Sequence, residues 1–285
     1  MFKKSIVTVY EPNSRKKINF FKTWAIMIEN IICSRELIIQ LFKRDFLMAY
    51  KKSFLGMGWI FISPVIGIIS WVFMNLTGVL NPGDVGIPYP AYVLLSTSIW
   101  GLFMGFYSSA AGTLSAGTGF INQVNYPHEV LLVKQTAQQL ANFFITFIVT
   151  LIVLCLFGVF PHWKIIFFPI LMLPLFFLGA AIGLVVSVVG VVAADLQKGA
   201  DFLLGLVLYI TPVVYSAKID NPLLQKIIQW NPLTYLIGGV RDIIIYGNFE
   251  YIDRFLMATG FALVIFMLSW RIFYISEDKV IEKML

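Results

Sequence analysis

Few residues in this chain of 285 have the types and spacing that catalysis or metal binding needs. The two histidines, His128 and His162, fall in separate predicted loops, and the two cysteines, Cys33 and Cys155, lie in a basic tail and in an apolar run. Neither a disulfide nor a thiolate metal site is indicated by two cysteines placed in this way. His128 and Glu129 form the one neighbouring pair that could act as acid and base. We therefore expect no catalytic residues, no metal site and no cofactor bound by this chain.

The composition places the chain in a membrane. It is 59% hydrophobic and 13% charged, and its mean hydropathy is +0.85. Soluble domains average roughly 45–50% apolar and about 25% charged residues, so a single core with a polar surface is excluded. We expect an all-α integral membrane protein. Residues 1–30 carry scattered charges without a cleavable leader pattern, which predicts insertion through internal segments.

Apolar segments predict six membrane spans, since about 20 apolar residues cross about 30 Å of hydrocarbon. The first four contain no charged residue; the fifth is short and carries Pro212, and the sixth needs Arg271 to extend toward the headgroups. The spans are Ser53–Gly83, a helix near Ala91–Gly112, Gln135–Trp163, Ile165–Ala194, Phe202–Ala217 and Phe255–Ile275. Residues 218–253 are too broken by Asn-Pro pairs for a span and too apolar for an ordinary loop, which predicts short helices there.

Positive charge predicts the orientation of these spans. Residues 1–52 hold 11 of the 21 Lys and Arg residues against 4 acidic ones, a balance of +7, whereas the rest of the chain sums to −1. By the positive-inside rule this basic tail lies in the cytoplasm, and six spans return the C-terminal tail, 276–285, to the same side. The basic residues flank spans, so they indicate contact with anionic membrane lipids and not with nucleic acid.

The segment Phe21–Phe46 reads as an amphipathic helix at the membrane surface. Most of its large apolar residues recur at helical spacing, with the charged residues off that face. We expect the helix to be broken near Ser34. A helix of a small cytosolic domain is the alternative, although the aromatic and lysine content favours the membrane surface.

Small residues also recur at helical spacing in two of the spans. They are Gly101, Gly105, Ser109 and Gly112 in the second span and Gly179, Gly183, Ser187 and Gly190 in the fourth. Such faces let helices approach closely. They fit either packing inside one bundle or an interface between two copies of the chain.

Aromatic residues make up 16% of the chain, and several lie well inside spans, where Trp and Tyr need a polar partner or water. A path for sugars would offer flat aromatic faces, although lipid-facing or packed aromatics are equally compatible with the pattern. The candidates for lining such a path are Trp100, Phe103, Phe106, Tyr107, Tyr209 and Tyr215.

The chain contains no energy source of its own. It has no GxxxxGK[ST] nucleotide-binding loop, no HExxH and no GxSxG motif. Coupling to protons or sodium normally uses charged residues inside spans, and the first four spans have none. A transporter built in this way must take its energy from a partner, or else it is a passive channel.

The stretch Leu41–Pro64 resembles the opening of permease subunits in ABC-type polysaccharide exporters, which move O-antigen, capsule or teichoic acid chains. The ordered landmarks are Arg44-Asp45, Tyr50-Lys51, Ser53, Leu55-Gly56, Trp59, Pro64, Asn125 to Leu131, Asp195-Leu196, Thr211 to Tyr215, Asn231-Pro232-Leu233, Arg241 and Gly247. These landmarks run in order from about Leu41 to Gly247 and cover most of the chain. One departure is His128, where the family tends to have arginine.

The resemblance implies a transmembrane subunit of an ATP-driven exporter in the bacterial cytoplasmic membrane. Two copies of the chain would pair with two copies of an ATP-binding cassette subunit, which would use ATP and Mg²⁺, and the cargo would be a lipid-linked polysaccharide. Residues 117–131 would contact the ATPase, and 218–253 would hold short helices of an outer gate. The residues implied for ATPase coupling are Asn125, Tyr126, Pro127, His128 and Glu129; those for the gate are Asn231, Pro232 and Arg241.

Arg44, Lys51 and Lys52 lie where the phosphates of a lipid-linked polymer would approach the cytoplasmic entrance. Anchoring to bulk anionic lipid explains each lysine equally well. The main alternative function is an ABC permease of the same architecture that exports a drug, a lipid or another small molecule. A membrane-embedded enzyme acting on lipid-linked sugars is a second alternative. Such an enzyme would need a cluster of catalytic residues, and His128-Glu129 is the one pair offered for it.

Overall fold

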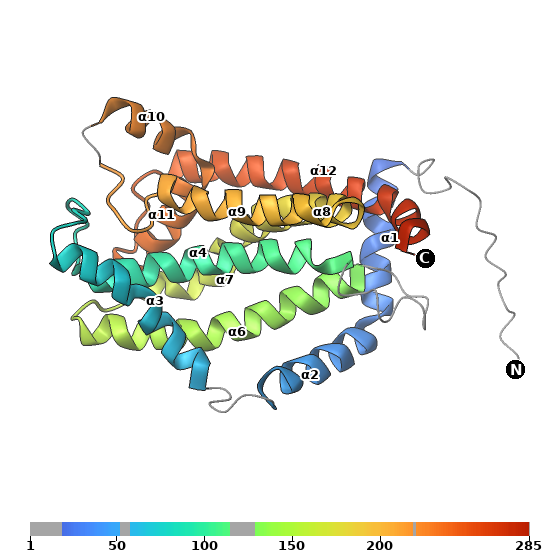
Figure 1. Cartoon of the computed structure of the whole chain (residues 1–285), viewed down its shortest axis with the longest axis horizontal. Coiled ribbons are helices and arrows are strands. Elements are labelled where there is room, and N and C mark those ends of the chain that lie inside the picture. The colour runs from blue at the N-terminus through green and yellow to red at the C-terminus, as the bar shows by residue number, and fades with distance from the viewer. Residues whose placement is uncertain (1–18, 52–57, 115–128, 219–220, 285) are drawn as a thin grey trace, which may run out of the picture.

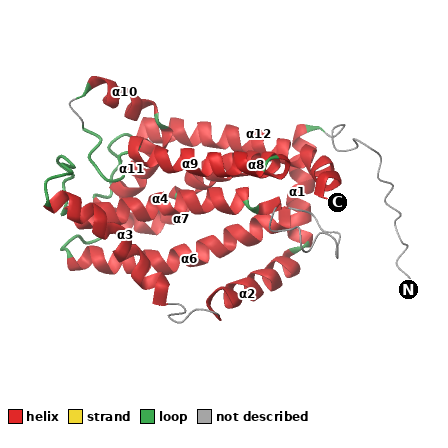
Figure 2. Cartoon of the chain, viewed as in Figure 1, coloured by secondary structure: helices red, strands yellow, loops and turns green. Residues whose placement is uncertain are grey.

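The computed structural model describes residues 19–51, 58–114, 129–218 and 221–284, which form helices and connecting turns without a strand among them (Figure 2). In chain order the elements are α1 (Phe20–Cys33), α2 (Arg35–Lys51), α3 (Gly58–Leu76), α4 (Tyr89–Ala111), α6 (Glu129–Leu156), the 3₁₀ helix η2 (Trp163–Phe167), α7 (Phe168–Leu171), α8 (Leu173–Val192), α9 (Ala194–Ile210), α10 (Pro222–Trp230), α11 (Pro232–Ile245) and α12 (Ile252–Met284). The all-α fold expected from the composition is confirmed over this part of the chain.

The long helices run side by side, and α1 crosses one end of their bundle (Figure 1). The N-terminal helices and the C-terminus lie at this end, which we call the terminal end. Helices α10 and α11 lie at the other end, which we call the α10–α11 end. The two ends therefore carry different elements, and each is treated as a separate site below.

Helices α1 and α2 take the place of the single amphipathic helix predicted for Phe21–Phe46. The expected break is confirmed at Ser34, whose backbone departs from helical geometry with ψ of 12° while its N–H still donates to Asn30 O. Phe21 and Ile32 of α1 are exposed, whereas Met27 is buried against α12. This division is the one expected of a helix with one face on the bundle.

The core forms around α4, which is buried along most of its length. Its observed bounds agree closely with the predicted helix near Ala91–Gly112. Helix α8 packs backbone to backbone against it: a Cβ on Gly179 would lie 2.9 Å from Phe103 O, and one on Gly183 would lie 2.6 Å from Ala110 Cβ. Packing inside one bundle therefore accounts for Gly179 and Gly183, while Gly101 of α4 has no neighbour within 4 Å.

Two predicted spans differ from the observed helices at their ends. Helix α6 already begins at Glu129, because Lys134 bounds the charge-free run without interrupting the helix, and it ends before Gly158, which has φ of +77°. The predicted span Ile165–Ala194 is divided into η2, α7 and α8. Pro169 and Pro174 open α7 and α8, and since proline has no N–H to donate, it favours a new helix start at each point.

The predicted fifth span, Phe202–Ala217, is wrong in its bounds. Helix α9 instead runs from Ala194 to Ile210, and Thr211 is extended with φ of −106° and ψ of 133°. The reason is Pro212, because a residue before proline is driven out of the helical region. Residues 211–218 therefore form an irregular segment that packs beside α4 and α11.

Two short helices, α10 and α11, lie within 218–253 as expected, and each begins at an Asn-Pro pair. Their place in an outer gate stays a prediction. The last predicted span, Phe255–Ile275, agrees closely with the apolar segment Ile252–Ser276, although α12 itself begins at Ile252 and continues through the expected tail to Met284. Arg271 of α12 lies over the Phe20 ring of α1, 5.4 Å from its centroid.

Four helical segments of the described chain are long and apolar enough to cross a membrane. They are Tyr89–Ala111, Glu129–Leu156, Trp163–Val192 and Ile252–Ser276. The apolar part of α3, Phe61–Leu76, is shorter, and α9 begins with a polar half that holds Asp195, Lys198 and Asp201. The structure thus supports a membrane protein with four such helices, and the count of six spans stays a prediction.

Candidate functional site

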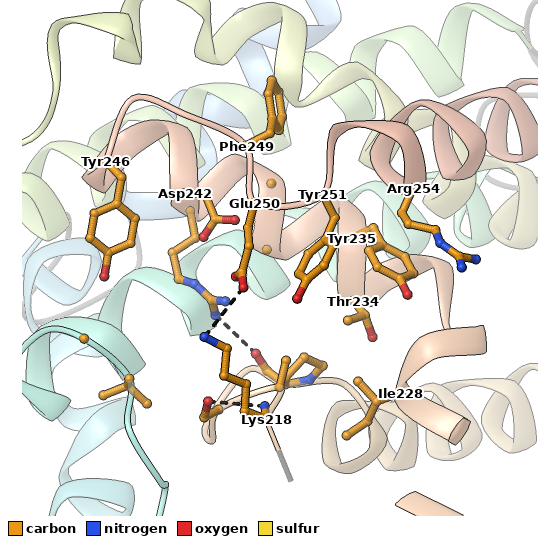
Figure 3. A pocket seen from close by; sticks show the side chains of 18 of the residues that line it. Lys218, Ile228, Thr234, Tyr235, Asp242, Tyr246, Phe249, Glu250, Tyr251 and Arg254 are labelled. Carbon is orange, nitrogen blue, oxygen red and sulfur yellow. Dashed lines mark hydrogen bonds and ion pairs between the residues drawn. The ribbon is translucent and has the colours of Figure 1, made fainter. Parts of the chain in front are cut away.

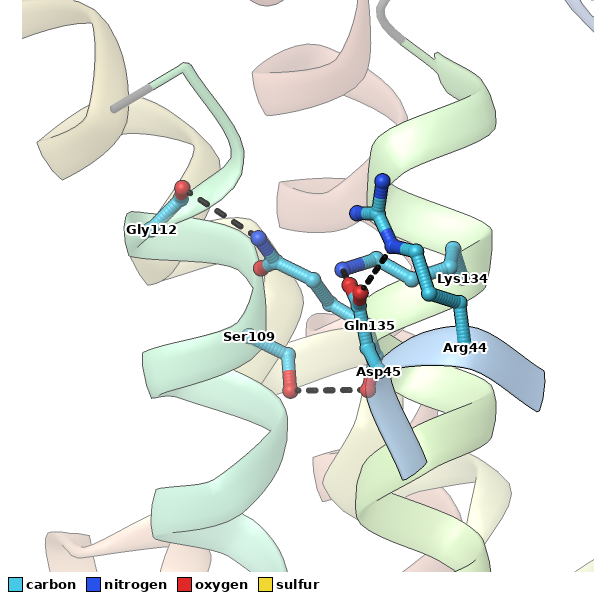
Figure 4. A network of polar contacts seen from close by, with 6 residues as sticks. All are labelled: Arg44, Asp45, Ser109, Gly112, Lys134 and Gln135. Atoms are coloured by element: carbon cyan, nitrogen blue, oxygen red, sulfur yellow. Dashed lines mark hydrogen bonds and ion pairs between the residues drawn. The ribbon is translucent and has the colours of Figure 1, made fainter. Parts of the chain in front are cut away.

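The first candidate site lies at the terminal end, where α2 meets α6 (Figure 4). Arg44, predicted at the substrate entrance, is half exposed and donates from Nε to Asp45 Oδ1 at 2.8 Å. Lys51 is the last residue of α2, and Lys52 lies outside the described residues. An entrance role for these three basic residues stays a prediction.

Asp45 joins α2 to the bundle. Its Oδ2 lies 2.8 Å from Lys134 Nζ, and the Lys134 side chain is 9% exposed. Burial raises the pKa of Asp45, but hydrogen bonds and charge from Arg44 and Lys134 outweigh burial and hold the pKa below its ordinary 3.8. The carboxylate is therefore ionised at neutral pH, and α2 is attached to α6 by a largely buried ion pair.

A second polar contact joins α1 to the start of α6. Asn30 Nδ2 donates to Glu129 Oε1 at 3.1 Å, and Glu129 is 1% exposed. Glu129 was predicted in the segment that contacts the ATPase; the other four members of that group, Asn125 to His128, lie outside the described residues. Glu129 to Leu131 of the predicted segment form the first turn of α6, directly after residues 115–128.

Sequence reasoning did not identify Asn30, Asp45 and Lys134 as members of this site. One feature could have indicated Lys134: it is a lysine at the edge of a long charge-free run, where a buried cation needs a partner. The identity of that partner is not visible in the sequence, because Asp45 lies 89 residues away.

The six aromatic candidates fall into two groups. Trp100, Phe103, Phe106 and Tyr107 are buried in the core of the single chain, where the Tyr107 hydroxyl donates to Asp201 Oδ1 at 2.6 Å. Tyr209 is exposed and contacts Trp71, with ring centroids 6.2 Å apart. Tyr215 is half-buried and donates to Tyr209 O. A role in lining a channel stays a prediction for all six.

The second candidate site lies at the α10–α11 end and starts from an asparagine cap. Asn231 Oδ1 accepts from Leu233 N at 3.0 Å, and its Nδ2 donates to Thr211 Oγ1 at 2.8 Å. Pro232 occupies the first helical position, where its missing N–H costs nothing. The predicted gate pair Asn231-Pro232 therefore starts α11 and also attaches it to the segment after α9.

Arg241, the third predicted gate residue, connects α11 with α4. Its Nη1 donates to the Tyr92 hydroxyl at 2.7 Å, to Ser96 Oγ at 3.2 Å and to Pro212 O at 3.2 Å, and its guanidinium lies 4.5 Å from the Tyr92 ring centroid. The Tyr92 hydroxyl also donates to Tyr215 O at 2.8 Å. One guanidinium thus holds three segments together.

Arg241 forms part of the wall of a pocket of about 840 Å³ (Figure 3). The pocket lies between α10, α11, the start of α12 and the segments 84–86 and 212–218. Sequence reasoning missed it, since its walls come from segments separated by up to 170 positions, from Asp84 to Arg254. Pockets of 300–1,000 Å³ commonly hold small molecules.

Comparisons with known proteins extend over most of this architecture. Residues 36–245 match the ABC-2 type transporter family. The O-antigen export system permease protein RfbA of Myxococcus xanthus is 26% identical over 219 residues, which cover 76% of this chain and 83% of the relative. Two RfbA proteins of Klebsiella pneumoniae are 23% and 24% identical, covering 82% and 81% of this chain and 90% and 88% of the relatives. Because this match runs from the second residue of α2 to the last residue of α11, the chain belongs to the ABC-2 type transporter family.

Proposed function

We propose that this chain is the transmembrane subunit of an ATP-driven exporter that moves a lipid-linked polysaccharide, of the O-antigen, capsule or teichoic acid type, across the bacterial cytoplasmic membrane. The observation that carries the proposal is the similarity, over most of the chain, to relatives named as O-antigen export permeases. The chain works as a transporter subunit and not as an enzyme.

The energy comes from a partner. ABC-2 permeases imply an ATP-binding cassette subunit, and the sequence has no nucleotide-binding loop. In our proposal two copies of this chain pair with two copies of that subunit, which binds and hydrolyses ATP with Mg²⁺. Residues 117–131 contact it. Both termini lie in the cytoplasm, which agrees with the excess of positive charge in residues 1–52.

The two candidate sites then take different parts in export. At the terminal end, Arg44, Lys51 and Lys52 meet the phosphates of the lipid-linked polymer. The polar links Asn30–Glu129 and Asp45–Lys134 connect the start of α6, whose first turn belongs to the ATPase-contacting segment, with α1 and α2. At the α10–α11 end, Asn231, Pro232 and Arg241 belong to the outer gate.

The test combines a partner assay with an export assay. The chain is coexpressed with the ATP-binding cassette subunit encoded nearest to its gene, purified through a tag on this chain, and examined for copurifying ATPase. In parallel, the gene is deleted and surface polysaccharide is measured by immunoblot. Copurification and loss of surface polysaccharide, both restored by the intact gene, are expected. Copurification with unchanged surface polysaccharide would refute polysaccharide export and favour a permease for a small molecule.

A further inference from the structure

The first turn of α6 is buried against the N-terminal helices. Val130 and Leu131 form a buried apolar cluster with Ile38 of α2, and Glu129 in the same turn accepts a hydrogen bond from Asn30 of α1. Interiors packed in this way transmit displacement, because their side chains have little free space around them. A movement of this turn therefore acts on α1 and α2 as well as on α6.

The end of α4 and the start of α6 are also joined to each other. Leu114, which follows α4, and Leu132 of α6 lie in one buried apolar cluster. Gln135 Nε2 donates to Gly112 O at 3.4 Å, and Figure 4 shows this side chain reaching from α6 to the end of α4. The two helix ends that flank residues 115–128 thus form one base, which holds them together when the chain between them is displaced.

Helix α2 packs on this base through α6. Its buried side chains among those described are Ile38 and Leu41, and one turn further Asp45 Oδ2 lies 2.8 Å from Lys134 Nζ. Apolar contact is non-directional and tolerates sliding, whereas a hydrogen-bonded ion pair fixes the position of α2 along α6. The Lys134 side chain is 9% exposed, so water and salt screen this pair less than they screen a surface pair.

The chain then leads from α2 into α3 through residues 52–57. Helix α3 is held loosely, because Ile68 is its one buried residue among the side chains that are described. Helix α4, by contrast, is buried along most of its length. A displacement of α2 therefore meets less resistance at α3 than it would at the core of the bundle.

We propose that the Asp45–Lys134 ion pair is the joint that passes movement of the ATPase-contacting segment on to α3. Asp45 and Lys134 are positioning residues: when the start of α6 moves, the pair carries α2 with it, and α2 displaces α3. The source of this movement, a partner ATPase, rests on the proposed function. Without the pair, α6 slides past α2, and ATP is hydrolysed without a displacement of α3.

The experiment reports on α3 directly. Phe73 of α3 is 63% exposed, so Phe73→Cys can carry a nitroxide label once Cys33→Ser and Cys155→Ser have removed the two exposed native thiols. The labelled chain, copurified with its ATPase in lipid nanodiscs, is examined by EPR before and after addition of ATP with vanadate. The spectrum should change in this parent complex and stay unchanged in Lys134→Met.

The double variant Asp45→Leu with Lys134→Met separates a joint from a merely structural contact. Apolar residues of similar volume in place of a buried ion pair often leave stability unchanged or raise it, so the double variant should fold and bind the ATPase even where Lys134→Met alone does not. It should nevertheless lack the ATP-dependent change at position 73. Melting temperature and the amount of copurified ATPase are measured for each variant.

Two controls keep the joint intact. Lys43→Met removes a lysine from the exposed side of α2 and is matched to Lys134→Met in chemistry and charge, while Lys134→Arg keeps the buried cation. Both should retain the ATP-dependent change. In cells, Lys134→Met and the double variant should lower surface polysaccharide about 5-fold or more at equal amounts of complex, the lower end of typical coupling between two sites. Lys43→Met should leave it unchanged.

An ATP-dependent change that persists in the double variant, or that is absent from the parent complex, would overturn the proposal. The export assay separates this outcome from failure of the proposed function. Gene-dependent surface polysaccharide that the pair variants leave unchanged refutes the joint alone. A pair-dependent change at α3 without gene-dependent surface polysaccharide refutes polysaccharide export and leaves the joint in place. A parent chain that copurifies with no ATPase refutes both.

Discussion

Replacing Gly183 by alanine should force α8 away from α4. A Cβ at this position meets Tyr107 O, Ala110 Cβ at 2.6 Å and Ala111 N at 2.9 Å. Two of these three atoms belong to the α4 backbone, which cannot turn aside as a flexible side chain can. Because ordinary van der Waals contact begins near 3.4 Å, the two helices must separate by about 1 Å.

The size of the effect follows from two opposing terms. Overpacking a well-packed core costs about 1–3 kcal/mol, whereas alanine in place of glycine in a helix interior returns up to about 1 kcal/mol. The net loss in free energy of unfolding is about 1–2 kcal/mol. At about 2–4 °C per kcal/mol for a chain of this size, the melting temperature should fall by about 2–8 °C.

The assay is thermal unfolding of the purified chain, followed by tryptophan fluorescence in one detergent. Gly101→Ala is the matched control, because this α4 glycine has no neighbour within 4 Å. It should leave the melting temperature unchanged or raise it slightly. Equal melting temperatures for the two variants would refute the backbone-to-backbone packing of α4 and α8.

Three further predictions concern polar contacts at the ends of the bundle. Lys134→Met should lower the free energy of unfolding by about 1–3 kcal/mol, measured by the same thermal unfolding, because Asp45 loses its buried partner. Since folding lowers the pKa of Asp45, the stabilisation by this ion pair is complete above pH 3.8 and is lost as the pH falls through the lower pKa of the folded state. Tyr92→Phe removes the hydroxyl that binds Arg241 and should lower surface polysaccharide, by immunoblot, at unchanged expression. Asn231→Ala removes the N-terminal cap of α11. It should lower the free energy of unfolding by about 1 kcal/mol and speed hydrogen exchange in the first turn of α11.

Local sequence features predicted the helices well wherever apolar length or an Asn-Pro pair decided the outcome. Residues 218–253 illustrate this, because each Asn-Pro pair supplies both a cap and a first helical residue, at Asn221 and at Asn231. Pro212 was noted inside the predicted fifth span, but the span was not ended at the residue before this proline. A helix that must stop before proline moves its whole span toward the N-terminus, and α9 does so at the cost of including Asp201.

The candidate sites were less predictable because they depend on which helices become neighbours. Arg241 was found through a resemblance, yet its binding to Tyr92 joins positions 149 apart. The ion pair of Asp45 and Lys134 presents the same problem. Charge counting treated Lys134 as the boundary of a span, whereas a buried partner on α2 lets the helix continue past it to Glu129.

The burial of each helix indicates which parts of one chain can move at the lowest cost. Helix α8 has nine buried residues and packs between α4 and α12. In a membrane such close packing holds helices together through van der Waals contact. Helix α9 has no buried residue among those described, and in α3 only Ile68 is buried among the side chains that are described. Separating α4 from α8 would expose that core, whereas displacing α3 or α9 would expose little that is not already exposed. A path that opens and closes should therefore be bordered by α3 and α9, with α4 and α8 as its rigid support.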